Sequence, residues 1–227
     1  MSSALQAVFF DMDGTLVSSE ELWFESELAI CSELGGVWTE ADQEAALGGQ
    51  LTTTAAMLLA RAGRDDMGVD EVAQWMLTDM ERRLRTSPVH WMPGARELLE
   101  SVRAAGVPCA LVTASYRSLA DAVLDAVGHD RFDTTVAGDE VPNMKPAPDA
   151  YLEAARRLGV DPRGCVVIED SPTGVRAGEA AGCAVLAVPS LGSVEPAPTR
   201  TLVGSLEQVD LDFLRGLVDA PLRQASA

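Results

Sequence analysis

The chain of 227 residues contains few cysteines and no long apolar run. Its four cysteines (Cys31, Cys109, Cys165 and Cys183) fit no CxxC spacing, so we expect buried, reduced thiols rather than disulfides. No apolar run approaches the roughly 20 residues that cross a bilayer, and the first residues lack the basic start and apolar stretch of a signal peptide. These absences predict a cytoplasmic protein that does not enter membranes.

Basic residues are also scarce. Seventeen lysines and arginines stand against 35 acidic residues, which gives a net charge of −18 and argues against nucleic acids and anionic membranes as partners. Lys145 is the only lysine in the chain. Hydrophobic residues make up 47% of the sequence, which argues against disorder, and the length suffices for one large domain or two.

Two carboxylates follow the first apolar segment of the chain. Residues 7–10 (AVFF) are short enough to form a buried strand, and Asp11, Asp13 and Gly14 come directly after them. Side chains alternate along a strand, so Asp11 and Asp13 would point the same way if both were extended. Like charges this close need a cation or a proton between them. The pattern indicates a divalent-metal site, an acid/base pair or both, with a solvated turn as the alternative.

Three later apolar segments end in comparable polar residues. Residues 109–112 lead into Thr113, residues 134–137 lead into the loop that carries Lys145, and residues 165–168 lead into Glu169 and Asp170. Each segment precedes a predicted helix, the pattern of a parallel α/β sheet, in which ligands bind at the carboxyl ends of the strands. Carboxylates, a hydroxyl and an ammonium gathered there would suit Mg²⁺ and a phosphate.

About ninety residues separate the first of these strands from the second, far more than a normal crossover. We predict helices over residues 20–34, 52–62 and 69–84, with their Met and aromatic stripes packed inside a helical cap. The predicted division is a cap of residues 18–88 inserted into an α/β core of residues 1–17 and 89–227. Within the core we predict helices over 95–105, 119–127, 151–158 and 206–217, a helix start at Ser171-Pro172 and a strand over 184–188.

Four motifs now stand in order: Asp11-x-Asp13-Gly-Thr, Thr113, Lys145-Pro and Glu169-Asp170. In this order they resemble the motifs of the haloacid dehalogenase-like (HAD) hydrolases, over roughly residues 7–189. The segments 145–149 (KPAPD) and 169–174 (EDSPTG) resemble the phosphatase and β-phosphoglucomutase branch. The resemblance implies a Rossmann-like core with a small helical cap inserted after the first motif.

The resemblance also implies a role for each motif residue. Asp11 would be the nucleophile that forms an aspartyl-phosphate, and Asp13 the general acid and then the general base. Thr113, the backbone N–H of Ala114 and Lys145 would hold the phosphoryl oxygens. Mg²⁺ would be held by the Asp11 carboxylate, the Asp13 backbone carbonyl and Asp170, with Glu169 bound directly or through water.

The reaction class depends on two cap positions. Trp23 stands where β-phosphoglucomutases carry a histidine, and Thr52 aligns where they carry an arginine that holds a second phosphate. Water is therefore the favoured acceptor, and we expect a Mg²⁺-dependent phosphomonoesterase that acts on a small sugar, polyol or glycolate phosphate. The alternatives are a sugar phosphomutase and a non-catalytic protein, either a phosphate-ester binder or a phospho-acceptor of the response-regulator type.

Several residues are candidates for substrate contact. Residues 19–23 resemble the same stretch in bacterial phosphatases of hexitol and deoxyhexose phosphates, so Trp23 could stack on a sugar and Glu20 could accept from its hydroxyls. Packing inside the cap is the alternative for Trp23. Ser115 and Arg117 could also touch the substrate, with a surface salt bridge as the alternative for Arg117. His90 and His129 are predicted to be structural, and the protein to be a monomer.

Overall fold

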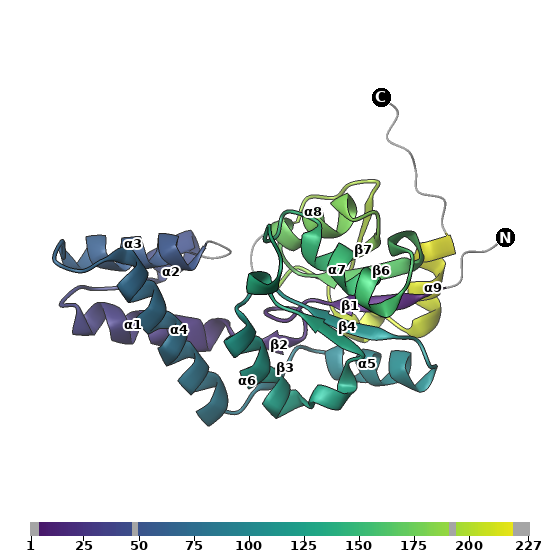
Figure 1. The fold of residues 1–227 in the computed structure, drawn as a ribbon, viewed down its shortest axis with the longest axis horizontal. Helices are drawn as coiled ribbons and strands as arrows, with labels where there is room; N and C mark the ends of the chain where they lie inside the picture. Colours follow the sequence, from purple (N-terminus) through teal and green to yellow (C-terminus); the bar gives the residue numbers. More distant parts are fainter. Residues whose placement is uncertain (1–4, 47–49, 191–193, 220–227) are drawn as a thin grey trace. The chain divides into compact units, whose positions relative to one another are not determined.

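The computed structural model describes residues 5–46, 50–190 and 194–219 (Figure 1). The chain divides into two compact units. One comprises Met1–Ser18 with Val89–Ala227, and the other comprises Ser19–Pro88. Among the described residues, no helix combines the length and the apolar composition that crossing a bilayer requires.

A six-stranded parallel sheet forms the centre of the first unit, in the order β5-β4-β1-β6-β7-β8. Its strands are β1 (Ala7–Phe10), β4 (Cys109–Val112), β5 (Thr134–Val136), β6 (Cys165–Glu169), β7 (Ala184–Ala187) and β8 (Arg200–Leu202). All residues of β1, β4 and β6 are buried, as expected for parallel strands covered on both faces. In the register of the sheet Phe9 lies between Ala110 and Val167, so β1 occupies a central position.

Helices cover both faces of this sheet (Figure 1). The helices are α5 (Ala95–Ala104), α6 (Arg117–Val127), α7 (Asp149–Leu158), α8 (Pro172–Ala180) and α9 (Leu211–Asp219). Helices α7 and α8 pack on one face, while α5 and α9 pack on the other. Ser171 caps α8 by accepting a hydrogen bond from the Gly174 backbone, with Pro172 in the first turn. The prediction of an α/β fold with a parallel sheet and an inserted helical segment is confirmed.

Short elements join these strands and helices. Strands β2 (Val17–Ser18) and β3 (His90–Trp91) form an antiparallel pair, and the 3₁₀ turns are η1 (His129–Arg131), η2 (Gly138–Glu140), η3 (Pro162–Gly164) and η4 (Leu206–Gln208). The prediction of one helix over residues 206–217 is wrong, because η4 and α9 are separate. Val209 is extended, and the Asp210 carboxylate accepts from the Phe213 backbone at 2.8 Å, which starts a new helix.

The unit Ser19–Pro88 contains α1 (Glu20–Glu33), α2 (Glu40–Ala46), α3 (Leu51–Ala62) and α4 (Val69–Thr86). The three predicted helices lie within two residues of α1, α3 and α4, whereas α2 was not predicted. Ile30, Leu58 and Met76 are fully buried in its apolar core, as the Met and aromatic stripes predicted. Gly36 permits close packing of α1 against α3, since a Cβ there would lie 2.9 Å from Ala62 Cα.

Candidate active site

The carboxyl ends of three adjacent strands carry the candidate polar residues of the first unit. Asp11 follows β1, Thr113 follows β4, and Glu169 and Asp170 end and follow β6. The sheet hydrogen bonding continues through these positions, because the Asp11 backbone donates to Ile168 O at 3.1 Å and the Thr113 backbone to Val136 O at 3.0 Å. The hydrogen bonds of the sheet therefore fix the backbone positions from which these side chains extend.

Lys145 joins two of the carboxylates. Its Nζ lies 2.7 Å from Asp11 Oδ1, 2.7 Å from Glu169 Oε1 and 2.9 Å from the backbone oxygen of Val112. The side chain is only 2% exposed, so these three acceptors replace its hydration. Burial by itself would lower the pKa of Lys145, but the Asp11 and Glu169 carboxylates raise it above its ordinary value. Lys145 is therefore a permanent cation at the centre of the site.

Asp11 is buried against a surplus of negative charge. It is 6% exposed, and burial raises the pKa of its carboxyl well above the ordinary value, with repulsion from Glu169 adding to the rise. The attraction of Lys145 acts in the opposite direction and does not cancel these effects. Three carboxylates thus share one ammonium, and a further cation would lower the energy of the ionised site.

Glu169 accepts hydrogen bonds at both of its oxygens. Oε1 accepts from Lys145 Nζ and, at 2.9 Å, from the Tyr151 hydroxyl. Oε2 accepts from the Asp170 and Ser171 backbones and from Ser171 Oγ at 3.1–3.2 Å. Gly174 leaves room for this carboxylate, since a Cβ at residue 174 would lie 1.5 Å from Glu169 Oε1. Glu169 is therefore held in a single position by its own loop and by Lys145.

Two residues that the sequence analysis missed support these groups. The fully buried Tyr151 on α7 donates to Glu169, and its ring lies 4.8 Å from Lys145 Nζ and stacks on Phe9 at 6.2 Å. Ser190 Oγ donates to Asp170 Oδ2 at 2.6 Å. The position of Tyr151 on the apolar face of a predicted helix, six residues after Lys145, was the only sequence signal for it.

The carboxylates of Asp11, Glu169 and Asp170 form a cluster that could hold a metal ion. One oxygen from each lies within 4.8 Å of the others, and all three residues are buried. Carboxylate oxygens are the donors that hard divalent cations such as Mg²⁺ prefer. The donor set and its unbalanced negative charge both fit such an ion.

Thr113, Ser115 and Asp13 form a second group of contacts. The Ser115 backbone donates to Thr113 Oγ1 at 2.9 Å, and Ser115 Oγ donates to Asp13 Oδ2 at 2.7 Å. Ala114 lies between Thr113 and Ser115 in the sequence. Its carbonyl is so close to Gly138 that a Cβ added at residue 138 would lie 2.3 Å from Ala114 O. The structure thus brings Ser115 to the second aspartate of the first motif, a contact that sequence spacing did not predict.

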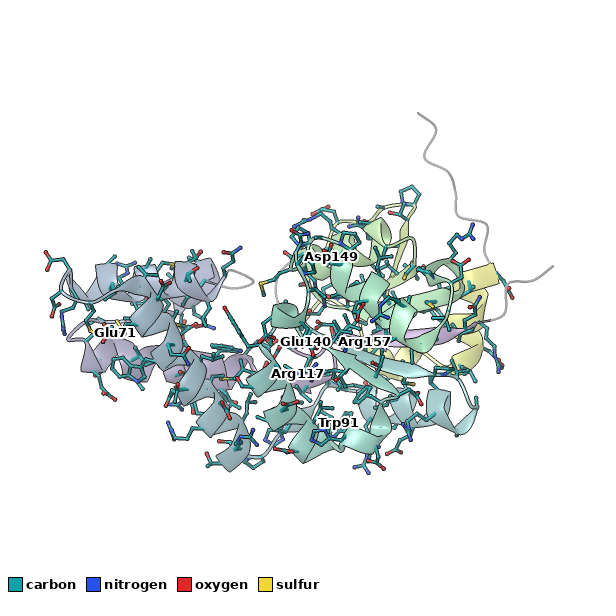
Figure 2. All side chains as sticks on the ribbon, in the orientation of Figure 1. Glu71, Trp91, Arg117, Glu140, Asp149 and Arg157 are labelled. Carbon is teal, nitrogen blue, oxygen red and sulfur yellow. The ribbon has the colours of Figure 1, made fainter. Side chains whose placement is uncertain are left out.

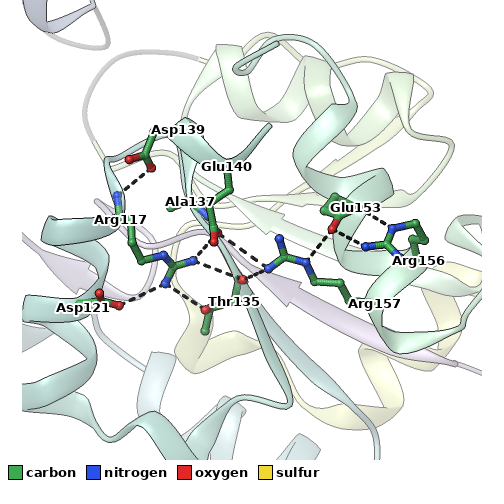
Figure 3. A network of polar contacts seen from close by, with 9 residues as sticks. All are labelled: Arg117, Asp121, Thr135, Ala137, Asp139, Glu140, Glu153, Arg156 and Arg157. Carbon is green, nitrogen blue, oxygen red and sulfur yellow. Dashed lines mark hydrogen bonds and ion pairs between the residues drawn. The ribbon is translucent and has the colours of Figure 1, made fainter. Parts of the chain in front are cut away.

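Arg117 takes part in a network of polar contacts that involves its own helix α6, strand β5 and the turn η2 (Figures 2 and 3). Its guanidinium pairs with Glu140 and bonds Asp121 at 3.2 Å and Thr135 Oγ1 at 3.0 Å. Arg157 also bonds the Thr135 backbone oxygen, at 2.6 Å. These contacts are the ones that the salt-bridge alternative for Arg117 predicted, and a contact with the substrate stays a prediction.

The remaining candidates are described by the elements that carry them. Glu20 is in the first turn of α1, and Trp23 packs partly buried against the apolar core of the unit Ser19–Pro88, in agreement with its packing alternative. His90 is exposed on β3, and the exposed His129 contacts Asp125 at 2.9 Å. The stretch 47–52, which was compared with the mutase arginine, falls partly outside the described residues.

Comparison with known proteins shows the family. The model of the haloacid dehalogenase-like hydrolases matches residues 5–182. The protein CbbY of Rhodobacter capsulatus is 31% identical over 195 residues, which cover 82% of this chain and 86% of that protein. Hexitol phosphatase B of Escherichia coli (strain K12) is 32% identical over 187 residues, covering 81% of this chain and 83% of the relative.

A solved structure agrees with these matches. CbbY from Rhodobacter sphaeroides, crystallised in complex with xylulose-(1,5)bisphosphate, superimposes with a TM-score of 0.82 at 26% identity, covering 92% of this chain and 99% of that one. The Rossmann-like core and the resemblance drawn from the four motifs are thereby confirmed. The chain belongs to the haloacid dehalogenase-like hydrolases and is a phosphatase of that family.

Proposed function

We propose that this phosphatase is a Mg²⁺-dependent phosphomonoesterase that hydrolyses a small sugar or polyol phosphate through an aspartyl-phosphate on Asp11. The observation that carries the proposal is the buried Lys145 ammonium, 2.7 Å from both Asp11 and Glu169 and adjacent to the cluster of three carboxylates. A cation and a metal-binding cluster beside one carboxylate are what attack on a phosphate dianion requires, because they offset the repulsion between two anions.

In the first step a carboxylate oxygen of Asp11 forms a bond to phosphorus as the bond from phosphorus to the ester oxygen breaks. Asp13 donates its proton to the leaving alkoxide, which departs as an alcohol. In the second step water attacks the aspartyl-phosphate, Asp13 takes the proton of that water, and inorganic phosphate leaves. Asp11 is then regenerated, so each residue ends the cycle as it began.

The phosphoryl oxygens would be held by Thr113, the Ala114 backbone N–H and Lys145. Thr113 is 1% exposed, and its Oγ1 accepts from the Ser115 backbone, which leaves the hydroxyl proton to donate. The three N–H groups of Lys145 already donate to Asp11, Glu169 and the Val112 carbonyl, so Lys145 would act on the phosphoryl group through its charge, which is in place before the substrate arrives. Donors that are already oriented need no reorganisation as negative charge develops in the transition state.

Mg²⁺ would be held by the Asp11 and Asp170 carboxylates and the Asp13 backbone carbonyl. When bound it supplies charge neutralisation for the nucleophile and the phosphoryl group. Glu169 already accepts five hydrogen bonds, which supports a contact through water rather than a direct one. Ser190 orients Asp170 for its part in this set.

The substrate class comes from the relatives. One relative is a hexitol phosphatase, and a protein of the same fold was crystallised with a sugar bisphosphate. The unit Ser19–Pro88, with Trp23 and Glu20 at its start, would act as the cap that selects the organic part of the substrate.

The test is phosphate release from a panel of hexose, hexitol, glycolate and nucleoside phosphates, with Mg²⁺ and with excess chelator. We expect metal-dependent release that Asp11→Asn reduces to the background rate, while Asp161→Asn, at the surface beside Arg163, leaves the rate unchanged. Full activity in chelator, or in Asp11→Asn, would refute the mechanism. Conversion of a sugar phosphate into its isomer without release would indicate a mutase, and a long-lived phosphorylated protein would indicate a phospho-acceptor.

A further inference from the structure

Tyr151 contacts both members of the buried ion pair between Lys145 and Glu169. Its hydroxyl donates to Glu169 Oε1 at 2.9 Å, and the same oxygen accepts from Lys145 Nζ at 2.7 Å. Its ring lies 4.8 Å from Lys145 Nζ, which is the geometry of a cation–π contact. Tyr151 is fully buried, so water does not compete for either contact. One residue therefore touches the anion and the cation of the pair.

The position of Tyr151 is fixed from two sides. Its ring stacks on Phe9 of β1, with the ring centroids 6.2 Å apart and the ring planes 15° from parallel. Tyr151 lies in α7, and the start of this helix is joined to the segment before Lys145 by a hydrogen bond from Asn143 Nδ2 to Asp149 Oδ1 at 2.9 Å. A side chain held in this way loses little further freedom when its hydroxyl bonds a carboxylate. The hydroxyl therefore has one defined position in the core.

Tyr151 and Lys145 share one oxygen of Glu169. A carboxylate oxygen has two lone pairs, and Glu169 Oε1 uses them to accept from these two donors. Lys145 in turn divides its ammonium between Glu169 Oε1 and Asp11 Oδ1, each at 2.7 Å. A second donor on Oε1 reduces the attraction between this oxygen and the ammonium. The ammonium is therefore drawn less strongly toward Glu169 and stays close to Asp11.

We propose that Tyr151 is a positioning residue that keeps the Lys145 ammonium beside Asp11, where its charge acts on the phosphoryl group. The hydroxyl does so by sharing Glu169 Oε1, and the ring does so by its contact with the ammonium. The proposal rests on the function proposed above, in which Lys145 acts on the phosphoryl group. It goes beyond that function by naming the residue that determines where this charge lies. In this role Tyr151 needs no contact with the substrate and transfers no proton.

Two other roles for the Tyr151 hydroxyl have different consequences. If it served only the packing of α7, its loss would lower the melting temperature and leave the kinetic constants of the folded enzyme unchanged. If it held Glu169 for a bound metal ion, its loss would raise the Mg²⁺ concentration that gives half of the maximal rate, and saturating Mg²⁺ would restore the rate. Positioning of Lys145 instead affects all phosphomonoesters by a similar factor, because they share the phosphoryl group.

The test is Tyr151→Phe, which removes one oxygen atom and keeps the ring. We compare its kcat/KM with that of the wild type for an alkyl and an aryl phosphomonoester, over a titration of Mg²⁺. Calorimetry gives the dissociation constant of inorganic phosphate at saturating Mg²⁺. The control is Val102→Ala on α5, a fully buried position outside the candidate active site, which lowers stability without touching the ion pair. Thermal melting defines an assay temperature at which all three proteins are folded.

We expect Tyr151→Phe to lower kcat/KM about tenfold for both esters at saturating Mg²⁺, less than the roughly 10²–10³-fold that removal of a direct donor costs. The dissociation constant of inorganic phosphate should rise about threefold or more, because the charge that attracts it lies farther away. The Mg²⁺ concentration for half of the maximal rate should be unchanged. A crystal structure of the variant should show a distance from Lys145 Nζ to Asp11 Oδ1 longer than the 2.7 Å of the wild type.

Unchanged kinetic constants in a folded Tyr151→Phe enzyme would overturn the proposal, as would a loss that saturating Mg²⁺ restores. An equal loss in Val102→Ala, or a Tyr151→Phe chain that does not fold, would assign the hydroxyl to stability and overturn it as well. A loss confined to one ester would point to the organic part of the substrate instead of Lys145. If the wild type hydrolyses neither ester, the function proposed above fails, so the two failures are distinguishable.

Discussion

Replacing Glu27 by glutamine is expected to stabilise the unit Ser19–Pro88 above neutral pH. Glu27 lies on α1, is 4% exposed and accepts a hydrogen bond from Trp38 Nε1 at 3.1 Å. Burial raises the pKa of its carboxyl from 4.5 to about 7, and the Trp38 hydrogen bond offsets only part of that rise. At pH 8 the folded protein therefore holds a buried charge whose cost glutamine would remove.

The sign and size follow from the two pKa values. Between pH 4.5 and 7 the folded state binds more protons at Glu27 than the unfolded state does, so the free energy of unfolding falls as the pH rises through this window. Stability from protonated Glu27 is fully present below the unfolded pKa and lost above the folded one. At about 1.4 kcal/mol per pH unit the total is about 3 kcal/mol.

Urea unfolding of the full chain, followed by tryptophan fluorescence, measures this difference. Of the four tryptophans, Trp23, Trp38 and Trp75 lie in the helical unit, so the signal reports mainly on it. We expect the advantage of Glu27→Gln over wild type to grow by about 2–3 kcal/mol between pH 5 and pH 8. Glu33→Gln, on the exposed side of the same helix, is the matched control, because it removes the same charge without changing a buried group.

A constant difference between Glu27→Gln and wild type across this range would refute the reasoning. It would mean that the Glu27 carboxyl ionises in the folded state as it does in the unfolded one. A difference that grows equally in Glu33→Gln would point to the general charge of the chain instead, since the net charge is −18.

Two further substitutions test the packing of the catalytic unit. Gly174→Ala should lower the free energy of unfolding by about 1–3 kcal/mol and reduce phosphatase activity, because the added methyl group displaces the Glu169 carboxylate. The control is Gly216→Ala on the exposed side of α9, which should be neutral or slightly stabilising in the same urea titration. Lys145→Arg should abolish measurable turnover although it keeps the charge, because a planar guanidinium group does not fit a buried position that holds a single nitrogen. The control is Arg163→Lys, exposed beside Asp161, which should retain the wild-type kcat/KM. A Lys145→Arg enzyme with near-normal activity would contradict this account.

The sequence alone was sufficient to predict which strands carry the polar residues. Apolar runs that end in Asp11, Thr113 and Glu169 could be assigned to strands by length and by the helices that follow. Parallel strands share one carboxyl edge, so an ordered set of such endings predicts a common site without any knowledge of the strand order. The central position of β1 between β4 and β6 is what makes the endings adjacent.

The supporting contacts could not be predicted in this way. Tyr151 reaches Glu169 from a helix face, and Ser190 reaches Asp170 from a loop 20 residues later, so neither pair follows from local spacing. The ends of strands can be predicted because they follow from the period of the backbone. The contacts of Tyr151 and Ser190 cannot, because they depend on how helices and loops pack on the sheet. Short elements such as α2 and β8 escaped prediction because they carry too few residues to show a period.

The choice between lysine and arginine was a compositional signal that the geometry explains. Apart from Lys145, all lysine or arginine positions of the chain are arginine. The arginines that form ion pairs in the structure are at least partly exposed, as Arg117 and Arg163 are. A fork of five donors suits such carboxylates and carbonyls at the surface. At residue 145 the acceptors are Asp11, Glu169 and a strand carbonyl, all within 2.9 Å of one atom and closed off from water. A tetrahedral ammonium satisfies three converging acceptors from a single nitrogen, whereas a planar guanidinium would leave donors buried without partners. Rarity of a residue type along a chain can thus identify the position at which its particular shape is required.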